Sequence, residues 1–164
     1  MSDDGLDTAG VDTRTRTVLF AAVVVPSMWR GDLRIPLRVG PRGGPKTVLK
    51  AVADTGLEFD MVVDKSTFEQ NRSVFKTTGK TVSLHAPGGV SLTNGPADTY
   101  AAEVLYEEVA YPVEVAVLAE ALGRQPHVYV GLPFIRRAKV DLTKLLGIQP
   151  RADAGARKSD AARA

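Results

Sequence analysis

The chain has 164 residues, with 21 Lys and Arg against 19 Asp and Glu, and a formal net charge of +2. Its 44% hydrophobic and 24% charged residues are typical of a globular chain that can bury one core without disulfides or metals. The small net charge gives no reason to expect a nucleic-acid or membrane partner. The absence of cysteine excludes disulfides, thiolate metal sites and a cysteine nucleophile, and two histidines are too few for a histidine-rich metal site.

The two ends of the chain differ in composition from the part between them. Residues 1–13 are acidic with small side chains, and residues 149–164 are rich in Ala and Arg. Such segments bury too little surface to offset their ordering entropy, so we expect two disordered tails around one domain at 14–148. The N-terminus lacks the basic region of a secretory signal, and the longest apolar run, 18–25, is too short to span a bilayer. These features favour a cytoplasmic protein.

The first half of the domain has the pattern of strands separated by turns. Residues 17–25 form an apolar run typical of a buried strand. Residues 32–39 alternate between apolar and polar side chains, which predicts a half-buried strand, and the glycine- and proline-rich stretch 40–45 predicts a turn. Residues 47–54 and 61–63 predict two further strands. A short helix is expected over 64–71, with Asp64 or Ser66 as its N-cap.

The second half continues the β pattern. Residues 81–95 predict two short strands around a glycine-rich hairpin tip, and residues 98–106 and 111–119 predict another strand pair. After these come a buried strand at 127–131, a short helix or helical turn at 132–137 and a final strand at 138–142. The whole pattern favours a mainly β protein, a small closed or partly closed barrel with one or two short helices.

The tripeptide Asp54-Thr55-Gly56 follows one of these apolar strands. The dipeptide Asp-Thr also occurs at 7, 12 and 98, but only Asp54 follows an apolar strand and precedes glycine. One interpretation is an ordinary turn in which the aspartate accepts a hydrogen bond from its own backbone. The other is acid–base catalysis by two facing carboxylates that share a proton, one activating water and the other protonating a carbonyl oxygen.

The order of motifs resembles that of the retropepsin-like aspartic peptidases, particularly their small single-domain prokaryotic relatives. Over about residues 30–146, "AVADTG" is followed by the glycine hairpin "VSLHAPGGVSL" and then, about 75 residues after Asp54, by "VYVG" and a short helix. The resemblance implies a catalytic loop, a flap hairpin that closes over substrate, and a glycine whose backbone lies beside the loop. The residues that the resemblance assigns to these parts are Asp54, Thr55 and Gly56 for the loop, Leu57, Ala86, Pro87, Gly88 and Gly89 for substrate contact, and Gly131 beside the loop.

The resemblance also implies how the protein works. A single D-T-G supplies one of the two carboxylates, so activity requires a twofold homodimer with Asp54 of each subunit at the axis. The apolar run 18–25 is our candidate for the dimer contact, because it is too apolar to leave exposed. The expected partners are a second copy of the chain and a peptide or protein substrate, with no metal, cofactor, nucleic acid or membrane.

One residue departs from the family pattern. Leu57 stands where the family usually has alanine or serine, and with Val82 and Leu84 we expect it to line an apolar cleft. The first hypothesis is therefore an aspartic endopeptidase acting as a homodimer. The alternatives are a non-catalytic module of the same fold that dimerises or binds peptides, and a structural barrel with an accidental D-T-G.

Overall fold

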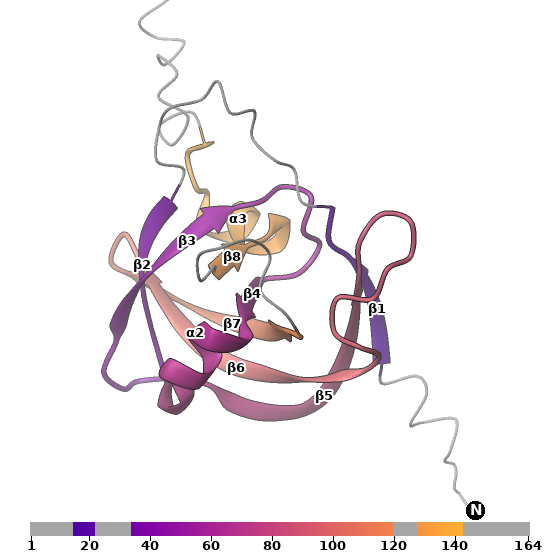
Figure 1. The fold of residues 1–164 in the computed structure, drawn as a ribbon. Coiled ribbons are helices and arrows are strands. Elements are labelled where there is room, and N and C mark those ends of the chain that lie inside the picture. The colour runs from indigo at the N-terminus through magenta and orange to yellow at the C-terminus, as the bar shows by residue number, and fades with distance from the viewer. Residues whose placement is uncertain (1–14, 22–33, 120–127, 143–164) are drawn as a thin grey trace, which may run out of the picture.

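A computed structural model describes residues 15–21, 34–119 and 128–142 (Figure 1). The tails expected at 1–13 and 149–164 lie outside these ranges, as do residues 22–25 of the apolar run. All described residues fall within the domain expected at 14–148. No helix among them is long and apolar enough to cross a membrane.

The strands form one sheet that closes into a barrel. The sheet order is β1-β5-β6-β2-β3-β8-β4-β7, and an additional β6–β7 pairing joins six of the strands into a closed ring, with β5 and β1 as an extension beside β6. The strands are β1 Thr15–Leu19, β2 Arg34–Gly40, β3 Thr47–Ala53, β4 Met61–Asp64, β5 Lys76–His85, β6 Ala97–Tyr106, β7 Val109–Leu118 and β8 Val128–Val130. The expectation of a mainly β barrel with one or two short helices is confirmed.

The alternating pattern in the sequence explains how the barrel is filled. In β2, Ile35, Leu37 and Val39 are buried while Pro36 and Arg38 are exposed, as period-two alternation requires. β4 is buried on both faces, so its side chains divide between two clusters. Met61 and Val63 point into the barrel, and Val62 points to the other side.

Two hydrophobic clusters result. The barrel core is the cluster inside the closed ring, formed by side chains that include Leu37, Val39, Met61, Val104 and Phe134. The β1-side cluster lies on the other face of β4 and β8, where β1 and β5 cover it. Its buried members are Phe20, Leu57, Phe59, Val62, Val82, Leu84, Ala116, Leu118 and Tyr129.

The two α-helices are short, and each has a defined end. α2 spans Lys65–Gln70 and is followed by a 3-10 turn, η1, at Arg72–Val74. The backbone amide of Thr67 donates to Oδ1 of Asp64 at 2.8 Å, so Asp64 rather than Ser66 is the N-cap. α3 spans Leu132–Ala138 and begins after the extended residue Gly131.

The final strand expected at 138–142 is wrong. α3 continues through Ala138, and Lys139 then adopts a left-handed conformation with φ of 53°. The amide of Val140 donates back to the carbonyl of Ile135 at 3.1 Å, and the Val140 side chain is buried. This is a helix C-cap that turns the chain onto the core, and it leaves no extended segment to pair with the sheet.

Candidate active site

The loop at residues 54–60 connects β3 to β4, yet these two strands are not neighbours. β8 lies between them, parallel to β3 and antiparallel to β4. The amide of Asp54 donates to the carbonyl of Val130 at 2.9 Å, and the amide of Gly131 donates to the carbonyl of Asp60 at 3.0 Å. The last residue of β8 and the glycine that follows it therefore hold the two ends of the Asp54 loop.

Gly131 lies directly against this loop. A Cβ atom placed on Gly131 would come within 1.9 Å of the carbonyl oxygen of Phe59 and 2.5 Å of that of Leu57. The amide of Leu132 also donates to the Leu57 carbonyl at 2.8 Å. Because the two nearest obstacles are backbone carbonyls, and the Leu57 carbonyl is held by the Leu132 amide, only glycine fits here without moving the loop.

Asp54 is buried at the end of β3, with 4% of its surface exposed. Its Oδ1 accepts a hydrogen bond from the amide of Gly56 at 2.8 Å, and its carbonyl accepts one from the amide of Leu57 at 3.2 Å. Thr55 between them is exposed. The side-chain bond to Gly56 orients the carboxylate, and an ordinary aspartate turn would also contain it. The bond therefore does not separate the two interpretations of the motif.

The leucine after the tripeptide lies in the core. Leu57 is fully buried in the β1-side cluster, as are Val82 and Leu84, the other two side chains expected to line a cleft. In this conformation none of the three is accessible to a ligand. Leu57 is covered in part by β1, because Phe20 forms an antiparallel bridge with it.

The glycine-rich hairpin projects beyond the sheet, to the right in Figure 1. The amide of Ala86 donates to the carbonyl of Val90 at 2.8 Å, and Gly88 and Gly89 adopt φ values of 93° and 89°. Residues 87–90 are exposed. The second strand expected after the tip is reduced to a single bridge between His85 and Ser91. We refer to residues 84–91 as the tip hairpin.

The residues at the end of β1 lie between the tip hairpin and the Asp54 loop. The amide of Phe20 donates to the carbonyl of His85 at 2.8 Å, and the amide of Ala21 donates to that of Gly56 at 3.0 Å. The amide of Glu58 donates to the carbonyl of Leu19 at 3.3 Å. Sequence reasoning missed this placement. It did not indicate that the described part of the apolar run, 18–21, contacts the Asp54 loop and β5 of the same chain, and the dimer contact expected for the run 18–25 stays a prediction.

Acidic and basic side chains meet beside the loop. Asp60 accepts a hydrogen bond from Nη1 of Arg137 at 2.6 Å and one from the backbone amide of Glu114 at 3.1 Å. The Glu114 carboxylate accepts hydrogen bonds from Arg16 and from the hydroxyl of Thr99. Burial acts to raise the pKa of Glu114, but the hydrogen bonds from Arg16 and Thr99 outweigh it and lower the pKa.

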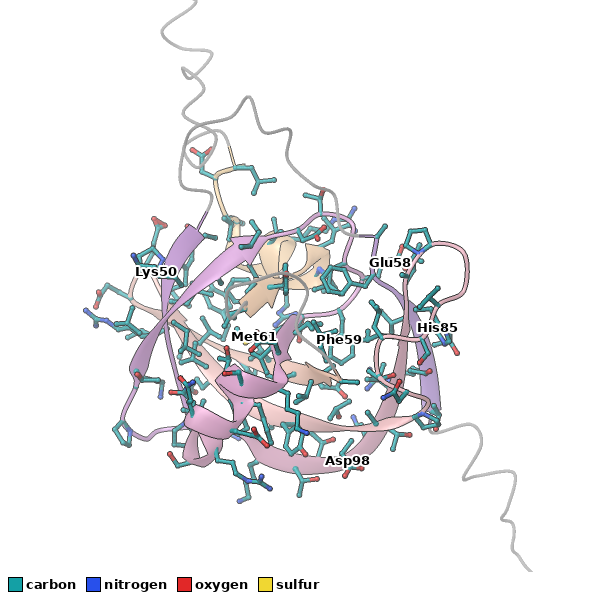
Figure 2. All side chains as sticks on the ribbon, viewed as in Figure 1. Lys50, Glu58, Phe59, Met61, His85 and Asp98 are labelled. Atoms are coloured by element: carbon teal, nitrogen blue, oxygen red, sulfur yellow. The ribbon has the colours of Figure 1, made fainter. Side chains whose placement is uncertain are left out.

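Arg16 brings β1 into this charged group. Its guanidinium carbon lies 5.4 Å from the centre of the Phe59 ring, within the range of a cation–π contact. A cavity of about 170 Å³ next to this contact is lined by Arg16, Glu58, Phe59, Asp60, Glu114 and Pro133. Figure 2 shows Glu58 and Phe59 on the side of the barrel that faces His85 and the tip hairpin.

Comparison with known proteins adds no homologue. No protein-family model matches the chain, and no curated protein matches it. The function is therefore argued from the geometry of the described residues and from the resemblance in motif order.

Proposed function

We propose that the protein is an aspartic endopeptidase that acts as a homodimer and hydrolyses extended peptides with water activated by paired Asp54 carboxylates. The observation that carries the proposal is the fixed position of Asp54. It is buried at the end of β3, in a loop whose two ends are bonded to Val130 and Gly131 and whose middle lies against Gly131. Acid–base catalysis needs a carboxylate held this firmly, because small misplacements of a catalytic group reduce rates strongly.

The reaction requires two such carboxylates. One takes a proton from water while the water oxygen bonds to the carbonyl carbon, and the other gives its proton to the carbonyl oxygen. Breakdown of this intermediate breaks the C–N bond, with the amine leaving after it gains a proton. The products are a carboxyl and an amine, and the shared proton returns to the pair. The chain has one D-T-G, so the second carboxylate comes from a second copy.

The remaining site residues have supporting roles in this proposal. Gly56 orients Asp54 through its amide, and Thr55, whose side chain is exposed, holds the loop together with Gly56. The tip hairpin, with Ala86, Pro87, Gly88 and Gly89, acts as a flap. It binds an extended peptide through main-chain hydrogen bonds, as in β-augmentation.

The test compares hydrolysis by the wild-type chain and Asp54→Asn, with a mixed peptide library from acidic to neutral pH. Both chains are also assayed with an added Phe20→Ala change. This change should loosen residues 19–21, which are bonded to the Asp54 loop and cover it. We expect Asp54→Asn to lose about a thousandfold or more in rate, because each carboxylate acts in the transition state.

The chain supplies its own matched control. Asp98 precedes a threonine, as Asp54 does, but it is exposed on β6 and lies at the lower edge of the molecule in Figure 2, away from Glu58. Asp98→Asn should hydrolyse peptides as the wild type does. A folded chain that cleaves nothing at any pH, with or without Phe20→Ala, would contradict the proposal, and so would an Asp54→Asn chain that retains full activity.

One observation favours the alternative of a non-catalytic peptide-binding module. The tip hairpin and the Asp54 loop bond an extended segment, residues 19–21, through the main chain, and this binding needs no catalysis. Peptide binding that is equal in wild type and Asp54→Asn, without hydrolysis by either, would support the module over the enzyme.

A further inference from the structure

The strand at the N-terminal end of the described chain occupies a place that a peptide substrate would need. β1 lies parallel to β5, in a register from Thr15 opposite Thr81 to Leu19 opposite His85. The amide of Phe20 then bonds to the carbonyl of His85, which is the last residue of β5 and lies at the base of the tip hairpin. The same segment bonds to the Asp54 loop at Gly56 and Glu58. An extended peptide between a flap and a catalytic loop would use these same main-chain donors and acceptors.

The contacts of Ala21 locate the segment relative to the proposed catalytic group. Its amide bonds to the carbonyl of Gly56, two residues after Asp54. The antiparallel bridge between Phe20 and Leu57 continues this pairing along the loop. The segment therefore lies along the part of the loop that directly follows Asp54.

We propose that residues 15–21, the β1 segment, are the chain's own occupant of the peptide cleft, bound in place of substrate. The proposal rests on the proposed function, because it identifies the groove between the tip hairpin and the Asp54 loop as the substrate site. It adds a regulatory step, in that the segment must leave before another peptide enters. It also defines a substrate class through the side chains that hold the segment.

The main anchor of the segment is Phe20. Its side chain is 1% exposed and packs edge-to-face on Tyr129, with ring centres 5.1 Å apart. Leu19, on the opposite face of the strand, is 43% exposed. The cluster therefore takes Phe20 fully and Val18, on the same face, in part, and it leaves Leu19 in solvent, so Phe20 is the main determinant of side-chain preference.

A second anchor lies four residues earlier, on the same face of the strand. Arg16 pairs with Glu114 and lies over the Phe59 ring. The side chains of Thr15 and Thr81 also bond at 2.6 Å. A peptide that competes with the β1 segment should therefore be extended, with a basic residue four positions before a large aromatic one.

The topology permits the segment to leave. β1 lies at the end of the sheet order, and the barrel closes through the β6–β7 pairing without it. Its departure would expose the β1-side cluster but would break no strand pair of the closed ring. Local opening of such a peripheral element requires less free energy than global unfolding.

The test measures peptide capture in the full-length chain, with Asp54→Asn present throughout so that nothing is hydrolysed. The probe is a fluorescent peptide with the sequence of residues 15–21, and its anisotropy reports binding. We expect Phe20→Ala to bind it about tenfold or more tightly than the chain with Phe20, because truncation of an anchor releases the resident segment. The same peptide with alanine in place of its phenylalanine should not bind.

The matched control is Leu19→Ala, which truncates the exposed neighbour and leaves the anchor in place. It should capture no more peptide than the Asp54→Asn chain that keeps both Leu19 and Phe20. Equal capture by all three chains, or none by a folded Phe20→Ala chain, would overturn the proposal.

Hydrogen exchange in the wild-type chain gives a second test that needs no variant. The amides of Phe20 and Ala21 should exchange through a local opening of lower free energy than the amides of β2 and β6. Exchange of these two amides only through global unfolding would contradict a displaceable segment. This test holds even if the Phe20→Ala chain fails to fold, because it uses the wild-type chain.

These tests separate the proposal from the enzyme hypothesis. If the Phe20→Ala chain captures the peptide but no chain that keeps Asp54 hydrolyses peptides, the β1 segment occupies a peptide-binding site and the protein is not a peptidase. If hydrolysis depends on Asp54 but no chain captures the peptide, the protein is a peptidase and the β1 segment does not occupy its substrate site.

Discussion

The two hydrophobic clusters are similar in composition but differ in how they are enclosed. Strands that pair on both sides surround the barrel core, so every side of it is covered by a hydrogen-bonded neighbour. The β1-side cluster depends on the strand at the end of the sheet order, because Phe20, which directly follows β1, is one of its buried members. Burial alone does not show this difference, since Phe20 and Leu37 are both almost fully buried.

The difference predicts how each region responds to the loss of a strand. Loss of any barrel strand removes ladder bonds on two sides, so the barrel core should be lost only in a cooperative, global transition. The β1 segment can separate while the ring stays closed. The Asp54 loop lies between the two regions, fixed by β8 on the barrel side and covered by the β1 segment on the other.

The largest effect is expected at the junction that fixes the loop. Gly131→Ala should lower the free energy of unfolding by about 3 kcal/mol or more, because its Cβ would overlap backbone carbonyls that cannot easily move. Chemical denaturation measures this. Gly79→Ala is the control, since Gly79 has a φ of 79° but open space around it, and should cost about 1 kcal/mol. Equal losses from both changes would mean that the close approach at Gly131 carries no special cost.

A cavity in the barrel core should destabilise the entire chain. Leu37 is fully buried in β2, and Leu37→Ala should cost about 3 kcal/mol in the free energy of unfolding. The amides of β2, β6 and β7 should all lose the same protection against exchange. Loss confined to β2 would contradict a cooperative barrel.

A larger cavity on the other side should cost less. Phe20→Ala removes more volume than Leu37→Ala, yet the loss of global stability should stay below about 3 kcal/mol, because it cannot exceed the free energy with which the β1 segment docks. Parallel denaturation curves of the two variants provide the comparison. A loss from Phe20→Ala greater than that from Leu37→Ala would make β1 an integral part of the fold.

The smallest effect concerns pH. Binding of Arg16 and Thr99 lowers the pKa of Glu114 from its ordinary value of 4.5, although burial opposes this. The resulting stabilisation is present above the ordinary pKa and is lost as the pH falls through the lower, folded-state pKa. Lys80 also favours the ionised carboxyl, and Asp60 accepts a bond from the Glu114 amide.

Acid should therefore loosen the β1 segment. An exposed ion pair contributes at most about 1 kcal/mol, so the change in the exchange rate of the Phe20 amide should be modest. The protection of the Phe20 amide against exchange should therefore fall between neutral and acidic pH, after correction for the intrinsic pH dependence of amide exchange. Glu114→Gln should remove this fall. A wild-type profile that matches that of Glu114→Gln would show that the pair does not hold the segment.

Much of the fold follows from local pattern. The alternation in 32–39 predicted which face of β2 is buried, and the glycine-rich tip and the capping position at Asp64 were visible as short-range signals. The end of α3 could not be predicted from such short-range signals. The left-handed Lys139 and the bond from the Val140 amide to the Ile135 carbonyl depend on helix packing rather than on a glycine.

The long-range pairings could not be predicted in this way. The parallel pairs β1–β5 and β3–β8 join segments far apart in the chain, and no turn residue marks them. The sequence predicted that Leu57 faces a cleft because it follows the tripeptide. Its burial depends on Phe20, a residue that the apolar run 18–25 gave no reason to place beside the loop.

We propose that two copies of Asp54 form one catalytic site, and this can be tested by mixing active and inactive chains. Phe20→Ala chains that keep Asp54 and Phe20→Ala chains that also carry Asp54→Asn are unfolded together in equal amounts and refolded. The hydrolysis rate of the mixture is compared with that of the unmixed Phe20→Ala chain. If each site needs an Asp54 from both chains, about one quarter of the dimers are active, and activity at the same total concentration falls to about one quarter. An activity of about one half would mean that each chain acts alone and would contradict the shared site.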